Sequence, residues 1–193
     1  MKYLTVGTNE IEQGLFNEVK DTDLKSSMKP IGGLWLTEYN EQKQMCSWVD
    51  FMMKHSHILF YKSRGISPFV QPCSLVNLKN NSHIYVLHNY QTLDYLMKCF
   101  PKEDKFSYEE LSKYYDGIYV NYDGLFLSKY DSNVLKKFSS FGVSSMVLFN
   151  LDCIDYYNSG QVLITPYDYE SGMDMPSGYR VEIDNKKKKV LKR

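Results

Sequence analysis

The chain has 193 residues, of which 43% are hydrophobic and 24% are charged, the composition of an ordinary globular protein. Its 23 basic and 23 acidic residues balance, but six basic residues lie in the last eight positions, which leaves 17 basic against 23 acidic residues elsewhere. An acidic body argues against a groove that follows nucleic-acid phosphates. No apolar run approaches the ~18 residues of a membrane span, so we expect no membrane partner.

The length predicts a single domain over residues 1–184, followed by a basic C-terminal tail over residues 185–193. The four cysteines are widely scattered without zinc-site or C-x-x-C spacing, and we see no signal-peptide pattern. We therefore expect a cytoplasmic protein with reduced, mostly buried thiols. The four histidines form no ligand pattern of the usual kind, so we predict no metal site.

The N-terminal part of the chain predicts a strand followed by a helix. Tyr3–Val6 reads as a short strand, and Gly7-Thr8-Asn9 comes directly after it. Apolar residues at helical spacing between Ile11 and Val19 then predict a helix, which Thr8 or Asn9 would cap.

The stretch Lys29–Phe51 holds both tryptophans of the protein. Gly32 and Gly33 predict a turn in which the backbone takes a positive φ or another segment comes close. Leu34–Thr37 follows as a short extended run. The stretch therefore predicts a turn that leads directly into a strand.

The second half of this stretch predicts an amphipathic helix over residues 42–54. Apolar residues recur there at the spacing that places one stripe against a core. Asn40 is the predicted N-cap of this helix, and Trp48 lies on its apolar stripe.

The rest of the chain alternates short strands and short helices. Strands are predicted over His57–Tyr61, Ser67–Val76, His83–Leu87, Ile118–Asn121, Val143–Phe149, Gln161–Thr165 and Tyr179–Asp184. Helices are predicted over Thr92–Phe100, Tyr108–Tyr115 and Asn133–Phe138, the second opened by a Ser107-x-x-Glu110 capping box. Strands outnumber helices without a regular βαβ rhythm, which indicates an α+β fold with a mainly antiparallel sheet.

The sequence lacks the common catalytic signatures, among them G-x-G-x-x-G, the P-loop, H-E-x-x-H and G-x-S-x-G. Three short motifs occur in a suggestive order: Val6-Gly-Thr8, then Gly32–Thr37 followed by a helix with Trp48, then the strand Ser144–Asn150. This order resembles the ADP-ribosyltransferase fold. The resemblance implies a mainly antiparallel sheet that is split around an NAD-binding cleft, with helices at the periphery.

The resemblance also assigns roles to residues of the first two motifs. Gly7 and Thr8 match the first motif and would hold the adenosine side of NAD, although Val6 stands where the family has His or Arg. Trp35 stands where the family has Tyr or Phe, and Thr37 matches the hydroxyl position. Together with Tyr39, Trp35 would pack on nicotinamide and ribose.

The third motif of the family supplies a catalytic acid, which would stabilise the positively charged ribose as nicotinamide leaves. Ser144 or Ser145 occupies that position here, and the nearest alternative acids are Asp116, Asp152 and Glu170. Glu170 lies in a polar, tyrosine-flanked segment whose other interpretation is a surface turn. We expect Asp116, Glu170 or Ser145 to reach the NAD site.

The implied activity is transfer of ADP-ribose from NAD to a macromolecule, either protein or nucleic acid, or hydrolysis of NAD. A looser likeness to small phage and bacterial proteins with a K-P-x-G-G-L-W motif points to a phage or toxin-like role. The alternative is a catalytically inactive nucleotide-binding or protein-interaction module on the same fold, for instance a phage or host-defence factor. Val6 and the serines of the third motif favour this alternative, because loss of charge-stabilising groups lowers the reaction rate steeply.

The resemblance makes a geometric prediction. Thr8, Trp35 and Tyr39 should line one pocket, and Trp48 should lie behind it as the core-facing anchor of its helix. The competing interpretation is that both tryptophans are core residues and that the glycine pair makes a tight turn.

Overall fold

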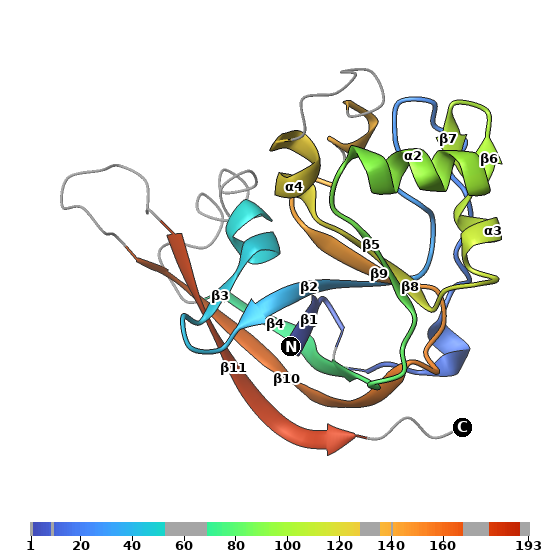
Figure 1. The fold of residues 1–193 in the computed structure, drawn as a ribbon. Coiled ribbons are helices and arrows are strands. Elements are labelled where there is room, and N and C mark those ends of the chain that lie inside the picture. Colours follow the sequence, from blue (N-terminus) through green and yellow to red (C-terminus); the bar gives the residue numbers. More distant parts are fainter. Residues whose placement is uncertain are drawn as a thin grey trace. The chain divides into compact units, whose positions relative to one another are not determined.

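The structure is a computed structural model that describes residues 2–8, 10–52, 69–127, 136–139, 141–167 and 178–189. It has an α+β fold with mostly antiparallel strand pairing, as predicted (Figure 1). The chain divides into two compact units. Unit 1 comprises Met1–Glu12, Thr37–Asn77 and Ile154–Arg193, and unit 2 comprises Gln13–Leu36 and Leu78–Cys153. Strand β2 (Leu34–Asn40) contributes its first residues to unit 2 and the remainder to unit 1.

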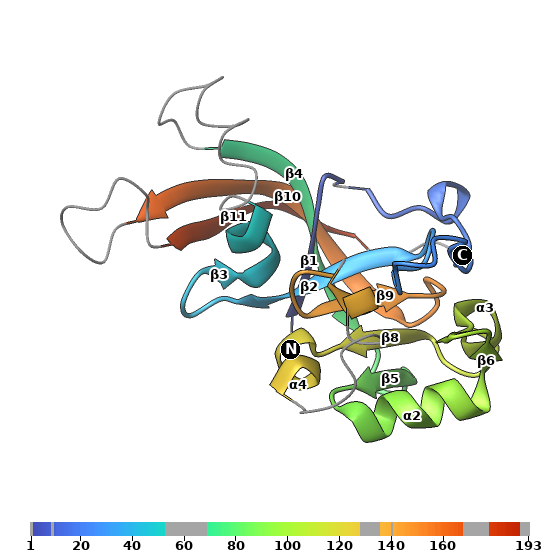
Figure 2. The same cartoon turned by 90° about the horizontal axis from the view of Figure 1, so that it is seen from above.

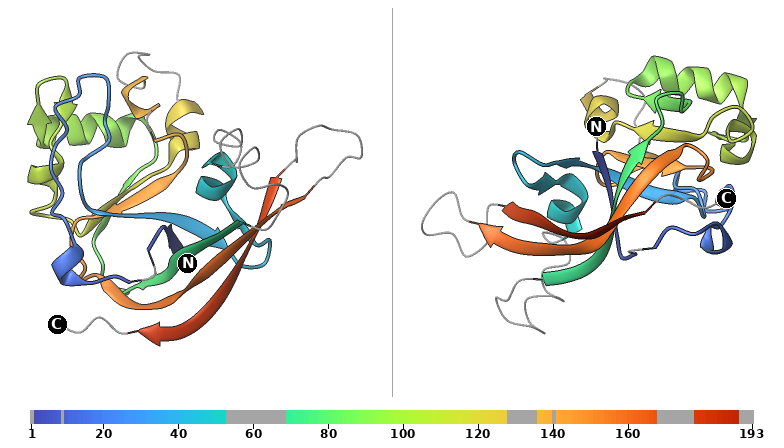
Figure 3. Two further views of the ribbon diagram at one scale, coloured as in Figure 1. Left: turned by 180° about the vertical axis from the view of Figure 1, so that it is seen from behind. Right: turned by 90° about the horizontal axis from the view of Figure 1, so that it is seen from below.

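Unit 1 is built on a sheet with the strand order β11-β10-β4-β1-β2, and a short β3 pairs with β2. Its strands besides β2 are β1 (Lys2–Val6), β3 (Met45–Cys46), β4 (Phe69–Leu78), β10 (Ile154–Tyr167) and β11 (Gly178–Lys189). The two longest strands, β10 and β11, run antiparallel as a curved ribbon (Figure 3). Strand β11 continues to Lys189 and so includes part of the segment that we assigned to the basic tail.

The core of unit 1 follows the alternation of its strands. Tyr179 and Val181 of β11 are buried beside Val162 and Ile164 of β10, whereas Arg180 between them is exposed. This is the period of two that a sheet with one buried face requires. The strand predicted over Tyr179–Asp184 is therefore confirmed as part of β11.

Unit 2 is built on a sheet with the strand order β2-β9-β8-β5, in which β5 and β8 are parallel and the other pairs antiparallel. Its strands besides β2 are β5 (Ile84–Leu87), β8 (Gly117–Val120), β9 (Ser145–Leu148) and the small hairpin of β6 (Pro101–Lys102) and β7 (Lys105–Phe106). Its helical elements are η1 (Gln13–Leu15), α2 (Tyr90–Cys99), α3 (Tyr108–Leu111) and α4 (Tyr122–Leu127).

Helix α2 covers part of the unit 2 sheet and runs beside β5 (Figure 2). Leu93 and Leu96 are buried in the same core as Leu87 and Ile118 of the strands. The helix begins at a capping box, in which the Asn89 side chain accepts a hydrogen bond from the Thr92 amide. No helix in the described ranges combines the length and the apolar character needed to cross a membrane.

One predicted helix is wrong, and a second begins later than predicted. Between Ile11 and Val19 the structure has only a single 3-10 turn, Gln13–Leu15, and Leu15 is exposed. Ile11 and Val19 are both buried, but tertiary packing buries them without forming a helix. Helical spacing alone therefore misled the prediction, because it does not distinguish a helix from a loop that buries two separated residues.

The helix predicted over residues 42–54 begins only at residue 47, after strand β3. Asn40 does not cap it, because its side chain accepts a hydrogen bond from the Lys43 amide in the β2–β3 turn. Trp48 packs against the unit 1 core, as predicted.

Helix α3 ends at Leu111 rather than Tyr115. The strand predicted over His57–Tyr61 lies outside the described residues.

Candidate functional site

Trp35 lies at the start of β2 in unit 2 and is half-buried. Its indole N–H donates a 3.1 Å hydrogen bond to the Gly32 carbonyl, and its ring centroid lies 5.5 Å from that of Phe141. The Lys29 Nζ lies 4.8 Å from the Trp35 ring centroid, which is cation–π distance. The Trp35 ring is therefore partly exposed. It packs against Phe141 on one side, and the Lys29 ammonium lies over the ring.

Lys29 has no carboxylate partner among the residues that the structure describes. Its side chain is half-buried, and this burial lowers the pKa of its ammonium group. A partly desolvated cation gains more from a nearby anion than a fully hydrated one does, because the local dielectric constant is lower. Lys29 and Trp35 therefore offer a positive charge beside a flat aromatic surface.

The fold itself requires Gly32 and Gly33. Both have positive φ, +74° and +70°. A Cβ at Gly32 would lie 2.3 Å from the Glu18 carbonyl oxygen, and one at Gly33 would lie 2.5 Å from Val147 Cγ1. Both predicted reasons for the glycine pair, positive φ and a close approach of other segments, are confirmed.

Gly7 and Thr8 lie in unit 1 directly after β1. The Gly7 amide donates a 2.8 Å hydrogen bond to the Pro72 carbonyl. The Thr8 hydroxyl donates to the Glu10 carbonyl (2.7 Å) and accepts from the Glu10 amide (3.2 Å). The Thr8 hydroxyl thus closes a local turn, whereas the Gly7 amide is bonded to strand β4.

Thr37 and Tyr39 also lie in unit 1, on the second half of β2. Thr37 is 4% exposed, and its hydroxyl lies 3.4 Å from that of Ser47. The Tyr39 hydroxyl donates a 2.9 Å hydrogen bond to the Val181 carbonyl. Each polar group is thus paired within unit 1, so a ligand would have to compete with these bonds or use the remaining acceptor capacity of the hydroxyls.

Asp116 and Ser145, two of the candidate catalytic residues, lie in unit 2 and make internal hydrogen bonds. The Asp116 carboxylate accepts from the His83 amide (2.8 Å) and from the Asn150 side-chain amide (2.9 Å). Ser145 is 3% exposed and donates to the Val143 carbonyl (3.1 Å). Asp116 thereby links the segments before β5, before β8 and after β9. Glu170, the third candidate, lies outside the described residues.

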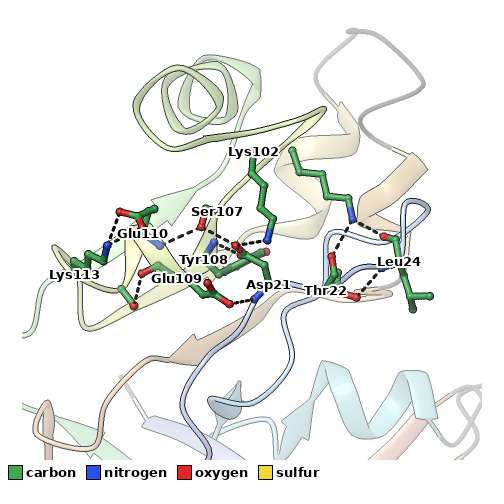
Figure 4. Close-up of polar contacts among 11 residues, drawn as sticks. Asp21, Thr22, Leu24, Lys102, Ser107, Tyr108, Glu109, Glu110 and Lys113 are labelled. Atoms are coloured by element: carbon green, nitrogen blue, oxygen red, sulfur yellow. Dashed lines mark hydrogen bonds and ion pairs between the residues drawn. The ribbon is translucent and has the colours of Figure 1, made fainter.

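The structure also contains a buried carboxylate site that the sequence did not predict, centred on Asp21 in unit 2 (Figure 4). The side chain of Asp21 is only 5% exposed. It accepts hydrogen bonds from the Ser107 hydroxyl (2.7 Å), the Tyr108 amide (2.6 Å) and the Lys102 ammonium (3.0 Å). Burial raises the pKa of this carboxyl, but the three donors outweigh burial and hold its pKa below the ordinary value.

A cavity of about 130 Å³ lies beside Asp21. Its lining combines buried Met28, Phe106 and Tyr108 with charged groups and Thr22. The charged lining residues are Asp21, Asp23, Glu103, Lys25, Lys102 and Lys105. The buried hydroxyl of Tyr108 has no hydrogen-bond partner within the described part of the chain. One indirect signal of this region is present in the sequence, the Ser107-x-x-Glu110 motif, because Ser107 both caps α3 and binds Asp21.

The described residues contain no group of three or more His, Cys, Asp or Glu side chains that could hold a metal ion. The candidate binding groups of unit 2 are therefore the Lys29–Trp35 pair and the cavity beside Asp21. Comparison with known proteins found no matching family model, no similar curated protein and no similar solved structure.

Proposed function

We propose that this protein binds a dinucleotide of the NAD type through an ADP-ribosyltransferase-like site that includes Lys29 and Trp35. Pairing of the strands that carry the second and third motifs supports this proposal. Within unit 2 the first half of β2 pairs with β9. These two motifs, far apart in the sequence, thus lie on paired strands.

The observation that carries the proposal is the Lys29 ammonium 4.8 Å from the centre of the half-buried Trp35 ring. A dinucleotide presents a diphosphate anion and flat rings. A half-buried lysine without a described carboxylate partner suits the diphosphate, and an aromatic face suits a base or nicotinamide ring. When the ligand binds, the Lys29 ammonium either leaves the indole ring or contacts the ring and the ligand together.

The chemical role depends on a carboxylate that stabilises the ribose cation. The Asp116 carboxylate links segments of the unit 2 sheet, and the Ser145 hydroxyl is bonded locally to the Val143 carbonyl, which favours the catalytically inactive binding module. The enzymatic version requires Glu170 or another acid to take this role. In that reaction the bond between ribose C1′ and the nicotinamide nitrogen breaks, nicotinamide leaves as a neutral molecule, and a macromolecular acceptor or water forms the new bond to C1′ and loses a proton.

Titration calorimetry with NAD tests the binding proposal. Lys29→Met keeps the aliphatic stem but removes the charge, and should weaken NAD binding about 10- to 100-fold, since a hydrogen bond to a charged group contributes about 1.5–3 kcal/mol. Adenosine, which carries neither a phosphate nor a formal charge, should bind both proteins equally. Lys113→Met, which removes an exposed partner of Glu110, is the matched control and should bind NAD normally.

An absence of NAD binding by the parent protein, or equal NAD binding by Lys29→Met, would refute the proposed site. Incubation with labelled NAD and a cell lysate distinguishes the two chemical versions. Labelled macromolecules identify an enzyme that transfers ADP-ribose to a macromolecular acceptor. Free nicotinamide without labelled macromolecules identifies an enzyme that uses water as co-substrate. Retained binding with neither product identifies a binding module.

A further inference from the structure

We infer that Lys29 is a covalent modification site for aromatic aldehydes, which its ε-amine captures as imines while Trp35 packs on the aromatic ring of the aldehyde. The inference rests on the position of the Lys29 amine over a partly exposed indole ring and on its lack of a carboxylate partner among the described residues. It uses the same two side chains as the proposed NAD site, but it goes beyond that proposal and does not depend on NAD binding.

The Lys29 amine has an environment that an ordinary surface lysine lacks. Its Nζ lies 4.8 Å from the Trp35 ring centroid, and its side chain is half-buried. Lys98, Lys102 and Lys113 each form an ion pair with a carboxylate, whereas Lys29 has no such partner in the described part of the chain. An ion pair holds the proton on an ammonium group, and the protonated nitrogen has no lone pair with which to attack a carbonyl.

The protonation of Lys29 favours the same reaction. Burial lowers the pKa of its ammonium group, whereas hydrogen bonds to carboxylates raise the pKa of Lys98, Lys102 and Lys113. At a given pH a larger fraction of Lys29 is therefore the neutral amine, which is the nucleophile. The exposed part of the side chain leaves access for a small reagent.

Trp35 supplies the selectivity for an aromatic ring. Its indole packs against Phe141 with ring centroids 5.5 Å apart, and part of the side chain remains exposed. The ring of an aromatic imine is conjugated with the C=N bond and lies close to its plane. An imine nitrogen near the position of the Lys29 Nζ therefore holds the new ring within the centroid distance of about 4.5–7 Å that offset aromatic pairs adopt.

Imine formation requires only the amine and the aldehyde. The nitrogen lone pair attacks the aldehyde carbon and forms a C–N bond, and one nitrogen proton passes to the carbonyl oxygen to give a carbinolamine. The hydroxyl group then leaves with the second nitrogen proton as water, and a C=N bond remains. The product is reversible, but cyanoborohydride adds a hydride to the imine carbon and traps a stable secondary amine.

Benzaldehyde and cyclohexanecarboxaldehyde form the decisive pair of probes, because both carry a six-carbon ring and only benzaldehyde is aromatic. Each is incubated with the full chain at pH 8 with cyanoborohydride, and the labelled lysines are identified by peptide mass spectrometry. The readout is labelling of Lys29 relative to Lys113 on the same chain, which corrects for the intrinsic reactivity of each aldehyde. We expect this ratio to be about ten with benzaldehyde and about two- to tenfold lower with cyclohexanecarboxaldehyde.

Two variants and a pH series test the roles of the two side chains. Trp35→Leu should abolish the preference of Lys29 for benzaldehyde, whereas Trp35→Phe keeps an aromatic face and should retain it. Thermal unfolding establishes that both variants are folded. As the pH decreases, labelling of Lys29 should persist to a lower pH than labelling of Lys113, because the Lys29 pKa is lowered and the Lys113 pKa is raised. A difference in exposure alone would give both lysines the same pH dependence.

The inference is overturned if benzaldehyde labels Lys29 no more than Lys113, if both aldehydes give the same ratio, or if folded Trp35→Leu keeps the preference for benzaldehyde. The same pH dependence at both lysines would also overturn it. The comparison of the two aldehydes uses the parent protein alone, so it decides the inference without any variant. NAD is absent from these reactions, so their failure leaves the calorimetric result for NAD intact, and a lack of NAD binding leaves this inference intact.

Discussion

The Ser107 hydroxyl donates a 2.7 Å hydrogen bond to the carboxylate of Asp21, 86 residues earlier in the chain. The same serine oxygen accepts a hydrogen bond from the Glu110 amide and caps helix α3. One hydroxyl therefore connects an N-terminal loop of unit 2 to the first turn of a helix. Asp21 in this arrangement stabilises the fold and also forms part of the cavity wall.

Asp21→Asn should lower the free energy of unfolding at pH 7 by about 1–3 kcal/mol, because the Lys102 ammonium and Ser107 hydroxyl lose a charged acceptor. The pKa of Asp21 is lowered in the folded state. Its stabilising effect is therefore fully present above the unfolded pKa of about 4 and is lost as the pH falls through the folded pKa.

Urea unfolding between pH 7 and pH 2.5 checks this prediction. The difference between the parent protein and Asp21→Asn should be constant down to about pH 4 and shrink below it. Asp94→Asn, which removes the exposed partner of Lys98, should have little effect at any pH. A difference that grows as the pH falls would contradict the direction of the Asp21 pKa shift.

Asp116→Ala should destabilise unit 2 by about 2 kcal/mol, because the His83 amide and the Asn150 side chain lose their acceptor. The neighbouring exposed Asp152, whose side chain accepts no hydrogen bond from any described residue, provides the control Asp152→Ala. Chemical denaturation measures both variants. Unchanged stability of Asp116→Ala would instead return Asp116 to the candidates for catalysis.

Gly33→Ala should lower the free energy of unfolding by about 2–4 kcal/mol, from the positive φ together with overlap of the new Cβ with Val147. Gly14→Ala is the matched control, because no described residue other than its chain neighbours lies within 4 Å of a Cβ at that position. Its stability should change by no more than about 1 kcal/mol. Thermal or urea unfolding measures the stability of both variants. Equal losses of stability would show that the residues around Gly33 move to accommodate the new Cβ without cost.

The four thiols should differ sharply in reactivity. Cys46, Cys73 and Cys153 are buried, and burial raises their pKa values to about 11, 11 and 12, whereas Cys99 is exposed. The thiolate is the reactive form. A disulfide reagent at pH 8 should therefore modify Cys99 quickly in the native protein and all four thiols only after denaturation. Rapid modification of a second native thiol, identified by mass spectrometry, would contradict the burial of these side chains.

Much of the fold could be predicted because its signals are local. Strands β1, β5, β8 and β9 lie within or overlap their predicted ranges, since short apolar runs bounded by turn residues have few other ways to be buried. The expectation of mostly buried thiols is also confirmed. The helix expected between Ile11 and Val19 failed because its apolar spacing is equally compatible with a loop.

The candidate site was less accessible from the sequence. The sequence marks Trp35 as an aromatic residue on a predicted strand, but nothing local reveals that Lys29, six residues away, lies over its ring. The sequence does not reveal the pairing of Asp21 with Tyr108 for a similar reason. Their relationship depends on a contact between segments 87 residues apart.

The sequence by itself determined the α+β class, the positions of most strands and the turn at Gly32 and Gly33, because backbone preference and hydrophobic period act over a few residues. Only the tertiary structure decided which polar groups are already paired. The Tyr39 hydroxyl finds its acceptor 142 residues away, and Asp116 finds a donor 33 residues away. Hydrogen-bond partners are chosen by the segments that folding brings together, so spacing along the chain cannot show whether a side chain such as Lys29 remains available to a ligand.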